Sequence, residues 1–216
     1  LSNTVNVTGQ THDGGTTEKE TTTPETPVNP TDPSVPPETE TPDEPELNTE
    51  DHYAYIVGYP DGTVRPEGNI TRAEVATIFF RLLTDESRDE FWSQTNDYTD
   101  VPADAWYNNA VSTLSNAGIL DGYEDGTFRP YKTISRQEAA AMLDRLYQVL
   151  GGKTDVVSEK AFADDAKIGD WARGSVYAMR QTGIMQGKEN NQFCPTDGYT
   201  AEQSIVTIER MYQIIK

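Results

Sequence analysis

Two short motifs of the 216-residue chain combine side chains that can cap a helix with a side chain that can bind an anion. They are TRAE at residues 71–74 and SRQE at residues 135–138, which lie 64 residues apart. The hydroxyl at the first position and the carboxylate at the fourth have the spacing of a capping box, in which both satisfy backbone N–H groups at the start of a helix. Folding therefore accounts for this part of each motif without a ligand. The capping residues are Thr71, Glu74, Ser135 and Glu138.

The arginine at the second position, Arg72 or Arg136, needs another explanation. The helix dipole mildly disfavours a cation in the first turn, and a third, weaker copy of the motif has Ala201 at this position. A guanidinium at a helix N-terminus can bind a planar carboxylate through two parallel hydrogen bonds. The alternative is an ion pair within the fold, with Asp100 or Asp121 as the partner. The residues by themselves favour neither explanation.

Both motifs belong to a longer repeat. GYPDGTVRP at residues 58–66 precedes the first, and GYEDGTFRP at residues 122–130 precedes the second. A fainter copy follows 65 residues later, at residues 187–195. Self-similarity at a fixed period indicates an array of supersecondary units. The expected divisions are a linker at 1–50, repeat one with a degenerate leading helix and a short inserted helix at 51–97, repeat two at 98–160 and a degenerate repeat three at 161–216.

Apolar residues after each motif recur with helical spacing. After Thr71 they fall at Val75, Ile78, Phe79 and Leu82, which form one stripe of a helix. The equivalent stripes are Ala139, Met142, Leu143 and Leu146, and then Ser204, Thr207, Ile208 and Met211. Three such helices can bury their stripes against one another, which predicts a helical bundle.

Trp106 and Trp171 occupy equivalent positions in the leading helices of repeats two and three. The spacing of Trp106 to Ala110 and Val111 places the indole on the apolar face, where it would act as a hydrophobic anchor. The alternative is that these side chains stack on a sugar. In the loops that follow, turn chemistry predicts positive φ angles at the glycines of the Asp-Gly-Thr sequences.

Residues 51–216 resemble the S-layer homology domain. The resemblance rests on a helix that carries a Trp, a Gly-Ile-Leu sequence at its end, a GYxDGTFRP loop and a helix that begins with TRAE. The resemblance implies an all-α, pseudo-threefold bundle of three repeats. It also implies a role in holding bacterial surface proteins on a secondary cell-wall polysaccharide, whose N-acetylmannosamine carries ketal-linked pyruvate. Repeat one departs from the family pattern, because Pro42 stands near the position of its expected Trp.

The resemblance implies grooves between repeats in which the motif arginine meets the pyruvate carboxylate. Arg72 and Arg136 match this position, whereas Ala201 does not, so the third groove is expected to be inactive or altered. The complete set of expected carbohydrate-binding residues is Arg72, Arg136, Thr71, Ser135, Glu74, Glu138, Trp106 and Trp171.

Composition separates the first 50 residues from the rest. They contain 8 of the 13 prolines, 11 acidic residues and one base, Lys19. Because few large apolar side chains are present to offset the entropy of ordering, we expect a disordered linker whose removal leaves folding intact. Both this segment and the remainder are acidic, which argues against nucleic acid or a membrane as partners.

No arrangement of residues indicates catalysis. The only histidines are His12 and His52, Cys194 is expected to be a free, half-buried thiol, and the loops lack the ligand positions of a calcium site. We therefore expect no catalytic residue, metal or cofactor. The chain reads as the C-terminal part of a longer precursor, and as a monomeric module that anchors an upstream domain to the outside of a Gram-positive cell wall. The alternative is a structural module that assembles with copies of itself into a surface lattice.

Overall fold

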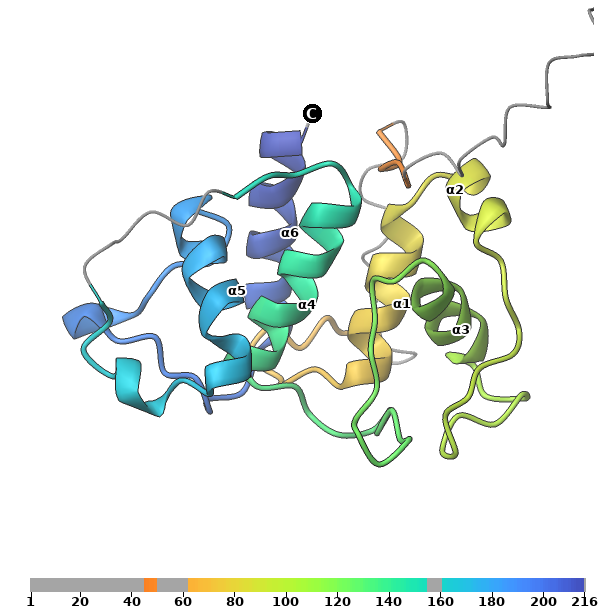
Figure 1. Ribbon diagram of the computed structural model, residues 1–216, viewed down its shortest axis with the longest axis horizontal. Helices are drawn as coiled ribbons and strands as arrows, with labels where there is room; N and C mark the ends of the chain where they lie inside the picture. The colour runs from red at the N-terminus through yellow and green to blue at the C-terminus, as the bar shows by residue number, and fades with distance from the viewer. Residues whose placement is uncertain (1–44, 50–61, 155–160, 216) are drawn as a thin grey trace, which may run out of the picture. The chain divides into compact units, whose positions relative to one another are not determined.

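The computed structural model describes residues 45–49, 62–154 and 161–215. These residues fall in one compact unit and form α-helices joined by loops, with isolated β-bridges but no strand in the described ranges (Figure 1). The helices are α1 (Arg72–Leu82), α2 (Asp85–Glu90), α3 (Asn108–Asn116), α4 (Arg136–Val149), α5 (Asp170–Gln181) and α6 (Ala201–Ile215). Single 3-10 turns lie at Asp165–Lys167 and Glu189–Asn191. The predicted all-α class is confirmed. The predicted linker up to residue 44 and the leading helix of repeat one lie outside the described residues.

The predicted apolar stripes form the core of the bundle. Val75, Phe79 and Leu82 of α1 are buried, and Ile78 packs against them. The equivalent residues of α4 and α6 are buried as well, including the polar Ser204 and Thr207. The inserted helix is also confirmed: α2 is capped by the Thr84 hydroxyl. After it, Trp92 packs on Phe80 with ring centroids 6.2 Å apart.

Three backbone hydrogen bonds form a closed ring that joins the repeats. Ile134 N donates to Ile70 O, Ile70 N donates to Tyr199 O, and Tyr199 N donates to Ile134 O, each at 3.0 Å. The three residues precede α4, α1 and α6 and are fully or almost fully buried. Each repeat therefore supplies one donor and one acceptor to its neighbours, which is the pseudo-threefold arrangement that the family resemblance implies.

The helix N-termini continue this cyclic pattern. The first two N–H groups of α1 donate to Lys132 O and Pro130 O of repeat two, at 3.0 and 2.9 Å. Those of α4 donate to Asp197 O and Pro195 O, and those of α6 return to Gly68 O and Pro66 O. Backbone carbonyls thus occupy the N–H groups that would otherwise attract an anion. Any anion site near these helices must depend on side chains.

Helices pair across the repeat boundaries. In Figure 1, α3 lies beside α1 and α5 lies beside α4, and both pairs are in contact. The second helix of one repeat therefore packs on the first helix of the next. Gly118 follows α3 in the left-handed conformation, with φ of 72°, as expected for a glycine that ends a helix.

The loops before α1, α4 and α6 share one backbone feature. Gly62 and Gly126 have φ of 78° and 77°, which confirms the predicted turns. Among the described residues, five without glycine's freedom also adopt positive φ, and three of them occupy the same position of the repeat: Arg65, Arg129 and Cys194. In the latter two, a carboxylate holds the strained backbone, because Arg129 N donates to Asp100 and Cys194 N donates to Asp164, each at 2.8 Å. Cys194 is a free, partly buried thiol, as expected.

Residues 45–49 pack on the bundle, although the sequence places them in the linker. Asn48 N donates to Leu82 O at 2.8 Å, Thr84 N donates to Glu46 O at 2.9 Å, and Leu47 forms an antiparallel bridge with Leu83. Leu47 also packs against the hydrophobic core. The apolar side chain and the bonds beside it order a stretch whose surrounding composition is typical of a linker.

We therefore expect two truncations to differ. Deleting residues 1–44 should leave the melting temperature unchanged, whereas deleting residues 1–49 should cost about 1–3 kcal/mol, because the partly buried Leu47 and its backbone hydrogen bonds are lost. Thermal melts of the two truncated chains measure the difference. Identical melting temperatures would show that residues 45–49 contribute nothing to stability.

Candidate functional site

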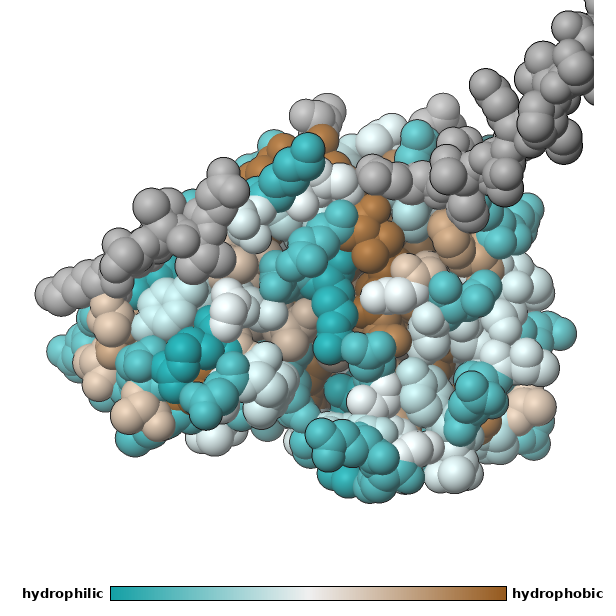
Figure 2. Space-filling view, in the orientation of Figure 1, coloured by the Kyte–Doolittle hydropathy of each residue, from teal (hydrophilic) through white to brown (hydrophobic). Residues whose placement is uncertain are grey.

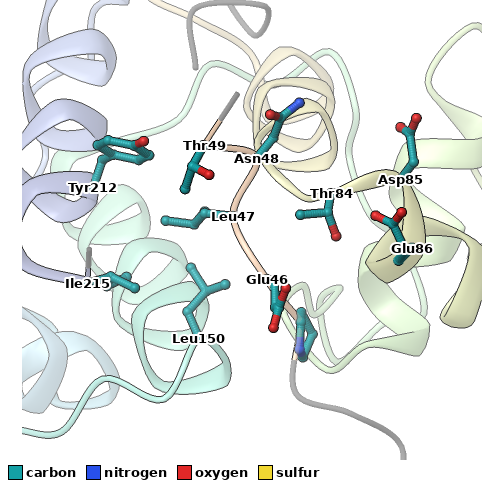
Figure 3. A pocket seen from close by; sticks show the side chains of 11 residues that line it. Glu46, Leu47, Asn48, Thr49, Thr84, Asp85, Glu86, Leu150, Tyr212 and Ile215 are labelled. Atoms are coloured by element: carbon teal, nitrogen blue, oxygen red, sulfur yellow. The ribbon is translucent and has the colours of Figure 1, made fainter. Parts of the chain in front are cut away.

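The described surface has several hollows, and the two considered as ligand sites are larger than the one of about 360 Å³ beside Gln186 and Lys188. The first, of about 560 Å³, lies between residues 45–49, the start of α2 and the ends of α4 and α6. In Figure 3, Leu47 points toward Leu150 and Ile215, while Glu46 and Glu86 lie on the other side. Among the described residues, the lining contains three carboxylates, from Glu46, Asp85 and Glu86, and no lysine or arginine. This hollow does not suit an acidic ligand.

The second hollow is a groove of about 870 Å³ between the loop that follows α3 and the first half of α4. It brings together four of the eight predicted binding residues, from α1, α4 and α5. They are Arg72, Ser135, Glu138 and Trp171. In the space-filling view, a band of hydrophilic residues runs over α4 toward this loop (Figure 2). The other four predicted residues, Arg136, Thr71, Glu74 and Trp106, do not line this groove.

Arg72 forms part of the floor of the groove and is only 5% exposed. Its Nε donates to Phe128 O at 2.7 Å, and its Nη2 donates to Asp121 O at 2.9 Å. The guanidinium also lies over the rings of Tyr123 and Phe128, at 4.8 and 4.5 Å from their centroids. Burial lowers the pKa of Arg72 from its ordinary value. The arginine thus contacts the neighbouring repeat through backbone carbonyls, not through the carboxylates of Asp121 or Asp100 that the sequence suggests.

Arg136 repeats this geometry one step along the bundle. It is 4% exposed, and its Nε and Nη2 donate to Phe193 O and Gln186 O, both at 2.9 Å. Its Nη1 has a further acceptor, Gln203 Oε1, at 2.6 Å. Both motif arginines therefore join adjacent repeats, and their removal leaves buried carbonyls unsatisfied. We therefore expect both arginines to contribute to stability, although the third repeat has Ala201 at the same position.

The capping boxes form as predicted. Thr71 N donates to Glu74 at 2.7 Å and Ser135 N donates to Glu138 at 2.9 Å, while the two hydroxyls accept the N–H groups of the glutamates. In the third copy, the Thr200 hydroxyl accepts Gln203 N at 3.3 Å. The Gln203 side chain turns instead to Arg136.

Glu138 also binds two groove residues that the motif did not point to. Its Oε1 accepts hydrogen bonds from Tyr123 Oη and from Lys132 Nζ, both at 2.6 Å. Burial raises the pKa of Glu138, but the hydrogen bonds from Lys132, Tyr123 and Ser135 outweigh it and lower the pKa to about 2. Glu138 is therefore ionised at neutral pH and fixes the Lys132 ammonium at the groove. Lys132 could have been suspected from its place between the loop and the cap.

The charges that line the groove are mostly paired. Arg129 contacts Asp125 at 2.7 Å, Arg145 contacts Asp121 at 2.8 Å and Lys132 contacts Glu138 at 2.6 Å. Among the cations of the groove, Arg72 is the exception, because its hydrogen bonds go to carbonyl oxygens and no ion pair is present for it among the described residues. Its Nη1 likewise has no hydrogen-bond partner there. Among the carboxylates, Glu124 also lines the groove outside the ion pairs of the described residues. Within the described residues, the groove therefore contains one cation that lies in no ion pair, although the Glu138 carboxylate is near enough to favour its charged form.

The two tryptophans are exposed and lie in different surroundings. Trp171 is 63% exposed and lines the groove of Arg72. Trp106 is 61% exposed and contacts the buried Tyr107 edge to face, with centroids 5.3 Å apart. Its expected place on the apolar stripe of α3 is wrong, because α3 begins only at Asn108 and the side chain precedes the buried face. The exposure of both indoles speaks against hydrophobic anchoring.

The S-layer homology domain family matches three segments of the chain, residues 53–76, 97–140 and 161–198. The chain belongs to the S-layer homology (SLH) family. The SLH segments at 97–140 and 161–198 contain α3 and α5, and each of the three segments contains one copy of the loop sequence that precedes a TRAE-like motif. Within the described residues, no helix is long and apolar enough to cross a membrane.

Proteins similar to this SLH chain include "Cell surface glycoprotein 1" of Acetivibrio thermocellus, which is 34% identical over 74% of this chain and 7% of that protein. The "Cellulosome-anchoring protein" of the same organism is 30% identical over 75% of the chain and 36% of its own length. The "Surface-layer 125 kDa protein" of Lysinibacillus sphaericus is 33% identical over 63% of this chain and 11% of its own length. The SLH chain thus spans about a third or less of each of these relatives.

Proposed function

We propose that this SLH chain is a non-catalytic module that anchors a surface protein to the cell wall, and that the groove around Arg72 binds the pyruvylated secondary polysaccharide. The family supports the coarser part of this proposal, since its relatives include cell-surface, surface-layer and cellulosome-anchoring proteins. The groove supports the finer part. The Arg72 guanidinium, which lies in no ion pair among the described residues and has a free Nη1 there, is the single observation that carries it.

A ketal-linked pyruvate presents a carboxylate on a sugar ring. The remaining N–H groups of Arg72 can donate to that carboxylate, and Lys132 adds a second positive charge nearby. The exposed indole of Trp171 offers a flat apolar face for the ring of an adjacent sugar. A cation and an aromatic surface in one groove suit an acidic saccharide better than a neutral one. Ser135 and Glu138 would act mainly by holding Lys132 and the start of α4.

The pseudo-threefold arrangement explains why this groove is the strongest candidate. Trp106 is the equivalent of Trp171, and Ala201 is the equivalent of Arg72, so the groove beside Trp106 lacks its arginine. The groove of Arg136 has no equivalent tryptophan in the described residues. Only at Arg72 do the described residues combine the arginine with an exposed tryptophan. Thr71, Glu74 and Trp106 then belong to a groove that has lost its main cation.

Titration calorimetry with purified wall polymer tests the proposal. We expect the intact polymer to bind, and polymer stripped of ketal pyruvate to bind about 10- to 150-fold more weakly, since a charge-assisted hydrogen bond contributes roughly 1.5–3 kcal/mol. Equal affinity for both polymers would refute the carboxylate contact. Sedimentation of the same samples addresses the lattice alternative, which requires association of the chain without polymer.

A further inference from the structure

The two motif arginines share two of three contacts and differ in the third. Arg72 and Arg136 each donate from Nε and Nη2 to backbone carbonyls of the following repeat. The Nη1 of Arg136 donates to Gln203 Oε1 at 2.6 Å, whereas that of Arg72 has no partner among the described residues. The part of the guanidinium that a ligand carboxylate would use is therefore occupied at Arg136.

The reason lies at the third residue of the following helix. In α4 this residue is Glu138, which closes the capping box with Oε2 and accepts from Tyr123 and Lys132 with Oε1. In α6 it is Gln203. A neutral amide there has neither the tyrosine nor the lysine as a donor, because the equivalent positions, 65 residues later, hold Lys188 and Asp197.

Lys188 and Asp197 bind each other instead. Lys188 Nζ contacts the Asp197 carboxylate at 2.6 Å. Gln203 Oε1 is thus left to accept from Arg136. The exchange also puts a carboxylate at the position of the Lys132 ammonium, while an ammonium, that of Lys188, stands at the position of Tyr123. Asp197 lies close enough to Arg136 to stabilise its charged form electrostatically, while it would repel an incoming anion.

From these contacts, and resting on the proposed function of the Arg72 groove, we infer that this chain has one groove for acidic saccharides and that Gln203 and Asp197 close the equivalent groove at Arg136. Gln203 fills the hydrogen-bonding edge of the guanidinium, and Asp197 places a carboxylate where the Arg72 groove has the Lys132 ammonium. These two residues would then determine the number of pyruvylated sugars that the chain can hold.

Arginine side-chain NMR of the full chain, titrated with N-acetylmannosamine that carries a ketal-linked pyruvate, tests the inference. In the wild type, we expect the Nε–H signal of Arg72 to shift and that of Arg136 to stay unchanged. In a Gln203→Ala, Asp197→Lys double variant, the Arg136 signal should also shift. The affinity of the Arg136 site for the pyruvylated sugar should be at least about tenfold higher than in the wild type. Each single variant should give a smaller gain.

Gln213→Ala is the matched control, because it makes the same change on an exposed part of α6. This variant should leave the Nε–H signal of Arg136 unchanged when the pyruvylated sugar is added. A response of Arg136 in the wild type, equal to that of Arg72, would overturn the inference, and so would a silent Arg136 in the double variant. A silent Arg72 in the wild type would instead refute the proposed function. Unmodified N-acetylmannosamine should shift neither signal, and a shift of Arg136 with this sugar would show that the closure does not concern the carboxylate.

Discussion

Replacing Arg72 with lysine should weaken binding to pyruvylated wall polymer by about 10- to 150-fold, the loss expected for one charge-assisted hydrogen bond. Lysine keeps the positive charge but cannot contact two carbonyls and a ligand at once, because it lacks the planar fork of the guanidinium. Titration calorimetry of the variant against the same polymer measures the effect. Its size makes it the sharpest test of which side chain meets the ligand.

Arg136→Lys is the matched control for this experiment. It removes the same kind of contacts from an equally buried arginine, so both variants should lose about 1–3 kcal/mol of stability in thermal melts. Only Arg72→Lys should also lose affinity. If both variants lose stability and neither loses affinity, the motif arginines are structural, and the ligand must contact other groups.

A fragment of residues 97–216 should fail to unfold cooperatively. It lacks Ile70, which both donates to and accepts from the ring of backbone hydrogen bonds. The fragment also lacks Gly68 O and Pro66 O, which accept hydrogen bonds from the first N–H groups of α6. Without α1, the face of α3 that packs on α1 is exposed to solvent. Each repeat packs against both of the others. A fragment with only two repeats therefore exposes the two faces that the missing repeat covers in the full chain.

Circular dichroism and calorimetry of this fragment, beside a fragment of residues 45–216, measure the difference. The longer fragment contains every described contact of the ring and should show one sharp transition. The shorter one should retain some helix without a cooperative transition. Native-like melting of residues 97–216 would contradict the interdependence of the repeats.

The sequence by itself determined the local parts of this protein. The 3.6-residue spacing of apolar side chains identified the buried faces of α1, α4 and α6. The Thr71 and Ser135 caps and the glycines with positive φ were equally readable. In each case the interacting groups lie within four residues of one another, so a short stretch of sequence contains both partners.

Only the tertiary structure decided the role of the motif arginines. Arg72 donates to carbonyls 49 and 56 residues away, and no local pattern names a backbone carbonyl as a partner. In the same way, the bundle groups Arg72 with Trp171 and separates it from Trp106, although the two tryptophans look equivalent in the sequence. Leu47 was assigned to a linker by its neighbours, yet it packs beside Leu83. These outcomes depend on how three similar repeats close on one another, because closure brings together residues that are distant in the chain. A single difference, such as Gln203 in place of Glu138, then changes the partners of a buried charge.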